Sequence, residues 1–118
     1  MATAEQQQID EGILSRVIIQ IIGKPEGNII TAMDLLIKKI KQDPKIQVLQ
    51  VEVSDVEPKD NLFSILVEIE LRTKTVDELG WFCFDYLPAS VEIIEPREMH
   101  YSAEHLTNFF NEIQGRIH

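Results

Sequence analysis

Four segments of the chain have the hydrophobic pattern of β-strands. Residues 13–22 (ILSRVIIQII) are β-branched and almost continuously apolar, which predicts a central strand with both faces covered. Residues 62–72 alternate between apolar and polar, which predicts one buried and one largely wet face. In residues 45–54 the alternation changes phase midway, which predicts a β-bulge. A short fourth strand is predicted over residues 90–95, where Pro96 stops it.

Three other segments have helical spacing, with apolar residues recurring every three or four positions. Each begins near a residue type that caps helices, and the second opens with the capping-box sequence Thr75-Val76-Asp77-Glu78. The predicted N-caps are Asn28, Thr75 and Ser102, and the helices end at Pro44, at Pro88 and near residue 117.

The elements follow the order β-α-β-β-α-β-α, which predicts an α+β fold. We expect a ferredoxin-like βαββαβ antiparallel sheet with an extra C-terminal helix, the two internal helices lying on one face. The chain has 118 residues, of which 44% are hydrophobic, enough for the core of one domain. We place that domain at residues 13–118 and predict that residues 1–12, which are polar and acidic, are a flexible tail.

Charge narrows the possible partners. The formal net charge is −9, with 20 acidic and 11 basic residues, so phosphate backbones and anionic membrane surfaces would repel the chain. The single cysteine, Cys83, excludes a disulfide framework. No apolar run is long enough to span a bilayer, and the N-terminus lacks the basic and apolar regions of a secretory signal. We therefore expect a cytoplasmic protein that binds neither nucleic acid nor membrane.

The strand VIIQII, the turn GKPEGN and the helix that begins at Ile29 together resemble the ACT-like group of ferredoxin-like regulatory domains. In ACT domains, a glycine-containing turn at this place often meets a small effector, commonly an amino acid, at a subunit interface. The resemblance implies that Gly23, Gly27 and Asn28 occupy the effector position.

A weaker resemblance covers the region from Thr75 to Phe110. The segment PASVEIIEP between two helices is similar to the C-terminal extension of WYL-type transcriptional regulators. Those extensions are ferredoxin-like and serve oligomerisation and effector response. Both resemblances imply a regulatory or interaction module.

The turn over residues 23–28 also has chemistry that is independent of any resemblance. Gly23 and Gly27 permit positive φ and close backbone approach, Lys24 adds charge, and the following helix offers free N–H groups to an anion. We predict a ligand-binding site at Gly23, Lys24, Gly27 and Asn28. The alternative is an ordinary strand-to-helix turn that needs its glycines for geometry alone.

Two groups of apolar residues lack an obvious partner. Trp81 and Phe84 lie away from the inward stripe of the second helix, so either the last helix or a partner covers them. Ile18, Ile22 and Leu66 are expected on the open sheet face beside Gln20, Glu68 and Glu70, where either the last helix packs or two sheets pair. The predicted interface residues are Trp81, Phe84, Ile18 and Leu66.

The sequence has no convincing catalytic or metal signature. His100, His105 and His118 are not spaced at i, i+3 or i, i+4, as metal ligands on a helix are, and Cys83 lies on an inward stripe without a nearby histidine. The carboxylates are expected on wet strand faces and loops, outside any cleft that would split their environments. We therefore predict no catalytic residue, no metal and no cofactor.

These observations support a leading hypothesis and two alternatives. The first is a non-enzymatic ACT-like module that forms a homo-oligomer, with a dimer favoured, and binds a small-molecule effector near the first turn. The second is an adaptor that docks a different protein through Trp81, Phe84 and the last helix. The third is a small enzyme whose site forms between subunits, with glutamates as acid and base.

Overall fold

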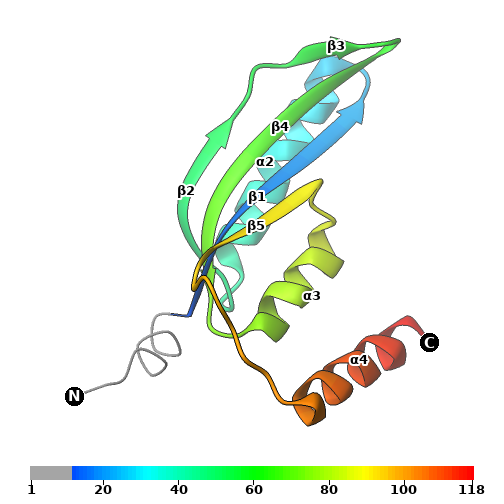
Figure 1. Cartoon of the computed structure of the whole chain (residues 1–118). Coiled ribbons are helices and arrows are strands. Elements are labelled where there is room, and N and C mark those ends of the chain that lie inside the picture. The colour runs from blue at the N-terminus through cyan, green and yellow to red at the C-terminus, as the bar shows by residue number, and fades with distance from the viewer. Residues whose placement is uncertain (1–11) are drawn as a thin grey trace.

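The structure is a computed structural model that describes residues 12–118. It is an α+β fold with one five-stranded antiparallel sheet and three helices in the described residues. The strands are β1 (Ile13–Gly23), β2 (Gln47–Val53), β3 (Glu57–Lys59), β4 (Leu62–Thr73) and β5 (Ser90–Glu95). The helices are α2 (Glu26–Gln42), α3 (Val76–Tyr86) and α4 (Ala103–Ile117) (Figure 1). The predicted N-terminal tail lies outside the described residues except for Gly12, which is buried.

The strands lie in the order β2-β4-β1-β5, and the short β3 pairs with β4. Sequence reasoning predicted four strands, and β3 is a fifth that lies between the second and third predicted strands. Lys59 pairs with Leu62 around a tight turn in which Asp60 has φ 55°. Because β3 is entirely exposed, no hydrophobic pattern marks it.

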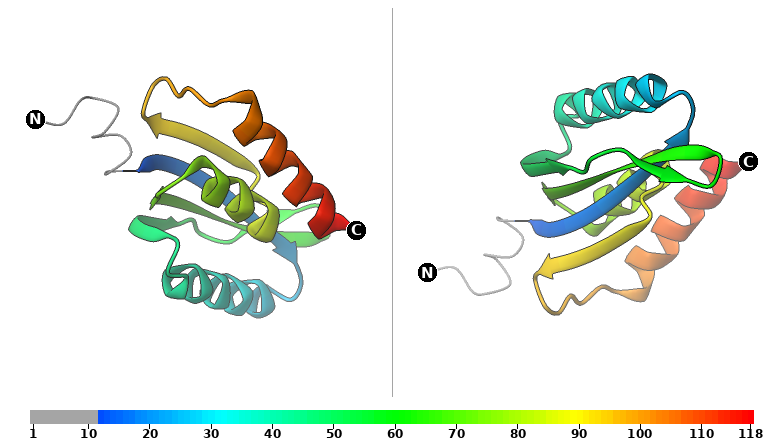
Figure 2. Two further views of the ribbon diagram at one scale, coloured as in Figure 1. Left: turned by 90° about the horizontal axis from the view of Figure 1, so that it is seen from below. Right: turned by 90° about the horizontal axis from the view of Figure 1, so that it is seen from above.

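The core lies on one side of the sheet, where α2 and α3 both pack (Figure 2). Alternate residues of β1 and β4 point to that side, and Val17, Val67, Ile69 and Leu71 are completely buried. Each such side chain contributes about 1.5–3 kcal/mol on burial. The helices supply the other half of the core, namely Ile29, Met33, Ile40, Leu79 and Phe82.

Most predicted element boundaries are confirmed. The bulge in β2 lies between Val48 and Gln50. The Glu78 N–H donates to Thr75 Oγ1 (3.2 Å), and the His105 N–H donates to Ser102 Oγ (3.0 Å), so two predicted N-caps hold. The prediction of Asn28 as N-cap is wrong.

Helix α2 starts earlier than predicted because proline, with its fixed φ, suits a helix start. Its N-cap is Pro25, which makes no side-chain hydrogen bond, and Glu26 lies in the first turn, where the helix dipole favours an acid. Asn28 therefore lies inside the helix, and its N–H donates to the Pro25 carbonyl (3.0 Å).

The prediction that both faces of the first strand are covered is wrong. Strand β1 is central, between β4 and β5, but its buried residues alternate with half-buried ones up to residue 20. Arg16, Ile18 and Gln20 point to the second face, on which no helix of the described residues packs (Figure 2). The run of isoleucines therefore marks a central strand and overstates its burial.

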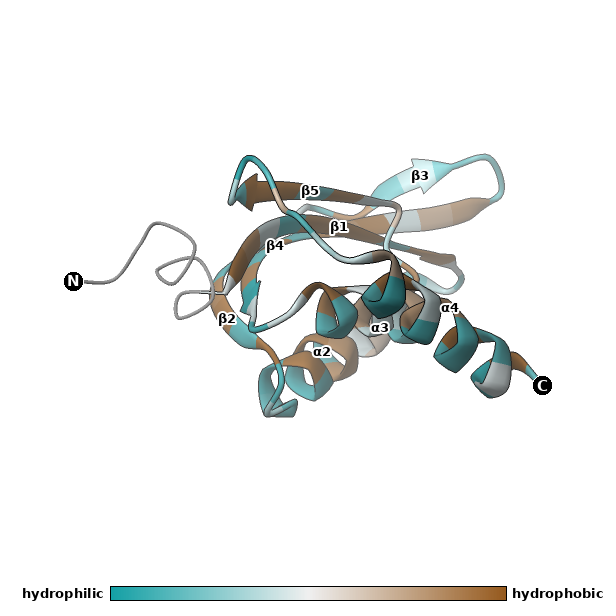
Figure 3. Cartoon of the chain, turned by 60° about the horizontal axis from the view of Figure 1, so that its bottom comes forward, coloured by the Kyte–Doolittle hydropathy of each residue, from teal (hydrophilic) through white to brown (hydrophobic). Residues whose placement is uncertain are grey.

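The last helix packs on α3 and leaves the second sheet face open (Figure 1). The Phe109 ring lies directly over Gly80 and makes an edge-on contact with Trp81 (5.9 Å between ring centroids). Helix α4 carries both apolar and polar residues along its length (Figure 3). None of them is fully buried, even on its apolar stripe. No helix in the described part of the chain is both long and apolar enough to cross a membrane.

Candidate functional site

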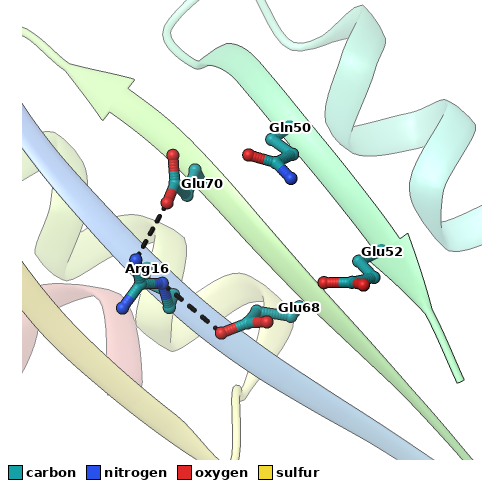
Figure 4. Close-up of a pocket in the computed structure, with 5 residues that line it drawn as sticks. All are labelled: Arg16, Gln50, Glu52, Glu68 and Glu70. Atoms are coloured by element: carbon teal, nitrogen blue, oxygen red, sulfur yellow. Dashed lines mark hydrogen bonds and ion pairs between the residues drawn. The ribbon is translucent and has the colours of Figure 1, made fainter.

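The centre of the open sheet face is Arg16, the only charged side chain of β1. The strand register places Glu70 of β4 on one side of it and Glu92 of β5 on the other. The Arg16 guanidinium contacts three carboxylates: Glu70 at 2.9 Å, Glu92 at 3.2 Å and Glu68 at 3.4 Å (Figure 4 shows the first and last). Three neighbouring strands, β4, β1 and β5, thus meet in one ion-pair network, which we call the Arg16 cluster (Arg16, Glu68, Glu70 and Glu92).

The cluster keeps its central charge. The hydrogen bond that Arg16 donates to Glu70 raises the pKa of Arg16, desolvation opposes it, and the negative charges of Glu70, Glu68 and Glu92 raise the pKa further. Arginine is already charged at every physiological pH, so the network has one fixed cation among several anions.

Two shallow hollows adjoin on this face and share Glu52 and Glu68 in their walls. The first has a volume of about 180 Å³ and is lined by Arg16, Gln50, Glu52, Glu68 and Glu70 (Figure 4). The second, of about 340 Å³, adds an apolar lining of Ile18, Val53 and Leu66. One region of the face is therefore acidic and the next is largely apolar.

The carboxylates of these hollows have the chemistry to bind a cation. Glu52 and Glu68 are direct partners in the β2–β4 register, so two carboxylates lie side by side. No group of three or more histidine, cysteine, aspartate or glutamate side chains in residues 12–118 is placed to hold a metal ion. An organic cation, such as an ammonium or guanidinium group, can form charge-assisted hydrogen bonds with carboxylates that approach it from one side only, because it does not need ligands all around it as a metal ion does.

The structure places Ile18 and Leu66 on this open face, as the alternation predicted. Gln20 joins them, and its amide donates to Ser64 Oγ (2.9 Å). The last helix does not cover them, because it packs on α3 instead. Their assignment as interface residues stays a prediction.

The turn residues predicted to bind a ligand lie between β1 and α2. Gly23 is the last residue of β1, and Lys24, Gly27 and Asn28 are exposed. Neither glycine has a positive φ, so the conformational reason given for them is wrong. An added Cβ on Gly23 would lie 3.2 Å from Ile29 Cγ2, which shows that this glycine allows close packing of α2. Ligand binding at the turn stays a prediction.

Trp81 and Phe84 lie beneath α4, one of the two positions that the sequence allowed. The two rings contact each other edge-on (5.8 Å), and the Arg116 guanidinium lies 4.5 Å from the Trp81 ring centroid and 5.2 Å from that of Phe84. Arg116 also pairs with Asp85. The cover is incomplete, since Phe84 remains 42% exposed.

Strand β5 is an edge of the sheet. Its helix side, the face of the sheet on which α2 and α3 pack, is exposed at this strand. Val91 and Ile93 pair in register with Val17 and Ser15 of β1. The two β1 residues are 0% exposed, but Val91 is 46% exposed and Ile93 is 38% exposed. Within the described residues, the helical layer that covers β1 stops short of β5 (Figure 2).

Two further candidates for chemistry, Cys83 and His105, are half-buried. Cys83 is half-buried, and burial raises the pKa of its thiol, which disfavours the reactive thiolate. His105 Nε2 lies 2.8 Å from Asp77 Oδ1, a hydrogen bond between α4 and α3 that the spacing of histidines does not reveal.

Sequence reasoning missed the Arg16 cluster and the bare side of β5. A lone arginine within an apolar strand is a usable signal, as are glutamates at alternate positions 68 and 70 of a neighbouring strand. The exposure of Val91 and Ile93 has no such signal, because the pattern SVEIIE reads as a half-buried strand.

Comparison with known proteins places the chain by family. The family model described as the MJ0538 family matches residues 14–118, which run from β1 through α4. No curated protein matches the chain, and no solved structure matches it. Because the family model covers most of the sequence, this chain belongs to the MJ0538 family.

Proposed function

We propose that this chain is a non-enzymatic interaction module with a ferredoxin-like, ACT-like architecture that forms a homodimer through β5. The arrangement of the four long strands supports the architecture. Leaving out the short β3, they alternate with α2 and α3 as β-α-β-β-α-β, and β1 and β4 lie at the centre of the sheet.

The proposal rests mainly on the exposure of the helix side of β5. Val91 and Ile93 are exposed beside register partners that are completely buried. The outer edge of β5 also has no strand partner in the described residues, and the strand itself contains no proline that would block pairing.

A second copy satisfies both features at once. Two β5 strands that pair antiparallel about a two-fold axis give each edge its backbone hydrogen bonds. The same pairing sets the Val91 and Ile93 rows of the two copies side by side, where cross-strand apolar contacts stabilise the sheet.

Sedimentation velocity at micromolar concentration tests the proposal. We expect the wild-type protein to be a dimer and Ile93→Asp to be a monomer with an unchanged circular dichroism spectrum. Leu35→Asp on α2 is the matched control, because Leu35 is an exposed leucine outside this surface and the change adds the same charge. A wild-type protein that is strictly monomeric at these concentrations contradicts the proposal.

A further inference from the structure

We propose that the open sheet face is a second interaction surface, separate from the β5 edge, that docks a basic amphipathic segment of a partner protein. The segment is extended and carries lysine or arginine beside an aliphatic side chain. Its cation lies between Glu52 and Glu68, and its aliphatic side chain lies over Ile18 and Leu66.

The first support is that this face has no cover from the described chain. Helices α2 and α3 pack on the opposite face, and α4 packs on α3 (Figure 2). Leu66 and Ile22 consequently remain 39% and 44% exposed in the middle and at the end of the sheet. Exposed aliphatic side chains rimmed by charged groups are typical of interaction surfaces.

The second support is an excess of carboxylate in the wall that the two hollows share. Glu52 lies directly opposite Glu68 in the register, and like charges in that position destabilise a sheet. In the described residues Glu52 has no ion-pair partner, and Glu68 shares Arg16 with Glu70 and Glu92. A ligand cation beside Glu52 and Glu68 supplies the counter-charge that the chain itself does not place there.

The third support is that the acidic and apolar parts are adjacent. Glu52 and Glu68 line the second hollow together with Ile18 and Leu66. A simple polyamine satisfies the carboxylates and leaves the apolar wall wet, whereas a peptide with a cationic and an aliphatic side chain contacts both. The chemistry of the two hollows therefore selects a basic amphipathic segment.

Charge also excludes a second copy of this chain as the occupant. The hollow around Arg16 has three carboxylates in its lining and one guanidinium. Stacking two such faces would bring like charges together away from water, which costs several kcal/mol. A basic partner is attracted instead, and the net charge of −9 strengthens that attraction at long range.

The test is an NMR titration of the full chain with a short blocked peptide of alternating lysine and leucine. We expect shifts in the amides of residues 18, 52, 66 and 68, and about threefold weaker binding for Glu52→Gln, as for a partly exposed ion pair. Leu66→Thr should weaken binding as well. Glu104→Gln is the control, because it removes the same charge from the exposed first turn of α4 and should bind like the wild type.

Three results would overturn the proposal. The first is equal weakening by Glu104→Gln, which would indicate general attraction to an acidic protein. The second is equal affinity for a lysine–serine peptide or for spermidine, which would remove the apolar contact. The third is a change of sedimentation coefficient in Glu52→Gln, which would place a second copy on this face. Ile93→Asp should still bind the peptide, so failure of the β5 dimer and failure of this surface are distinguishable.

Discussion

Substitution of Gly80 by alanine should separate the docking of α4 from the stability of the rest of the fold. Gly80 lies in the middle of α3, directly under the Phe109 ring of α4. A Cβ at this position would lie 2.5 Å from Phe109 Cζ, whereas ordinary contacts of a Cβ are 3.4–4 Å. The ring, and α4 with it, must therefore withdraw by about 1 Å, and a gap of that size forfeits up to about half of a contact's dispersion energy.

The structure sets the size of the effect. Five interactions between side chains hold α4 on α3: the Trp81–Phe109 contact, the Arg116 stacks on Trp81 and on Phe84, the His105–Asp77 hydrogen bond and the Arg116–Asp85 ion pair. With typical values for an edge-on aromatic contact, for cation–π contacts and for exposed polar pairs, they total about 2–5 kcal/mol. A loss of about 1 kcal/mol at Phe109 is then a large share of the free energy that holds α4 on α3. Alanine also stabilises α3 by about 1 kcal/mol over glycine, so global stability should change little.

Two measurements follow α4 directly. Trp81 is the only tryptophan in the chain, so its emission reports the contact with Phe109 and Arg116, and we expect a red shift in Gly80→Ala. Hydrogen exchange of the α4 amides should accelerate about fivefold, while the amides of β1 and β4 keep their protection. The matched control is Gly115→Ala, in the last turn of α4, where an added Cβ has no neighbour within 4 Å.

The reasoning is refuted if Gly80→Ala leaves both the Trp81 emission and the exchange of α4 at wild-type values. That result would mean that α4 accommodates the methyl group without moving. Equal acceleration in α4 and in the sheet would also refute it, because docking and global unfolding would then be one event.

Three further predictions concern the core and its titration. Thr73→Val should raise the free energy of unfolding by about 1 kcal/mol in urea titrations, because the Thr73 hydroxyl is buried without a hydrogen-bond partner in the described structure; an unchanged midpoint would indicate a partner. Gly12→Ala should lower it by at least about 1–2 kcal/mol, since Gly12 has φ +75° and an added Cβ would lie 2.2 Å from the Thr73 carbonyl oxygen; full stability would contradict the left-handed backbone. Burial, aided by Asp43 and Asp85, raises the pKa of Tyr86, so the folded state holds this proton to higher pH than the unfolded chain. The Tyr86 contribution is complete below the unfolded pKa of about 10 and is lost as pH rises through the folded value. Tyr86→Phe should therefore flatten the alkaline fall in stability, and an equally steep fall would count against the assignment.

The sequence was informative where a single periodicity decided the outcome. Alternation in residues 62–72 identified the two faces of β4, including the position of Leu66, and the hydroxyls of Thr75 and Ser102 marked helix starts. It failed at Asn28, where a good capping residue follows a proline that starts the helix earlier.

Other features depend on contacts that no local pattern encodes. The stripe of α4 indicates an apolar face but does not say which surface that face contacts. Gly80 is a local sign that another element approaches α3 closely, but it does not identify that element as α4. A lone arginine in an apolar strand indicates that it has polar partners but does not identify them, because the three partners of Arg16 come from two other strands. The exposure of Val91 depends on where the helical layer ends, which is a property of the whole chain.

The central position of β1 has a consequence for the order in which the protein is built. Val17 pairs with Ile69 of β4 and with Val91 of β5, about 50 and 75 residues later in the chain. Such distant pairings close slowly, because the intervening chain must give up its freedom before the contact forms. On the ribosome, the isoleucine-rich β1 is made first and acquires its two neighbours only after most of the chain has been synthesised. During that interval its apolar side chains and unpaired edges are exposed, which favours aggregation, and we expect a chaperone that shields β1 to raise the yield of folded protein more than one that acts on α4.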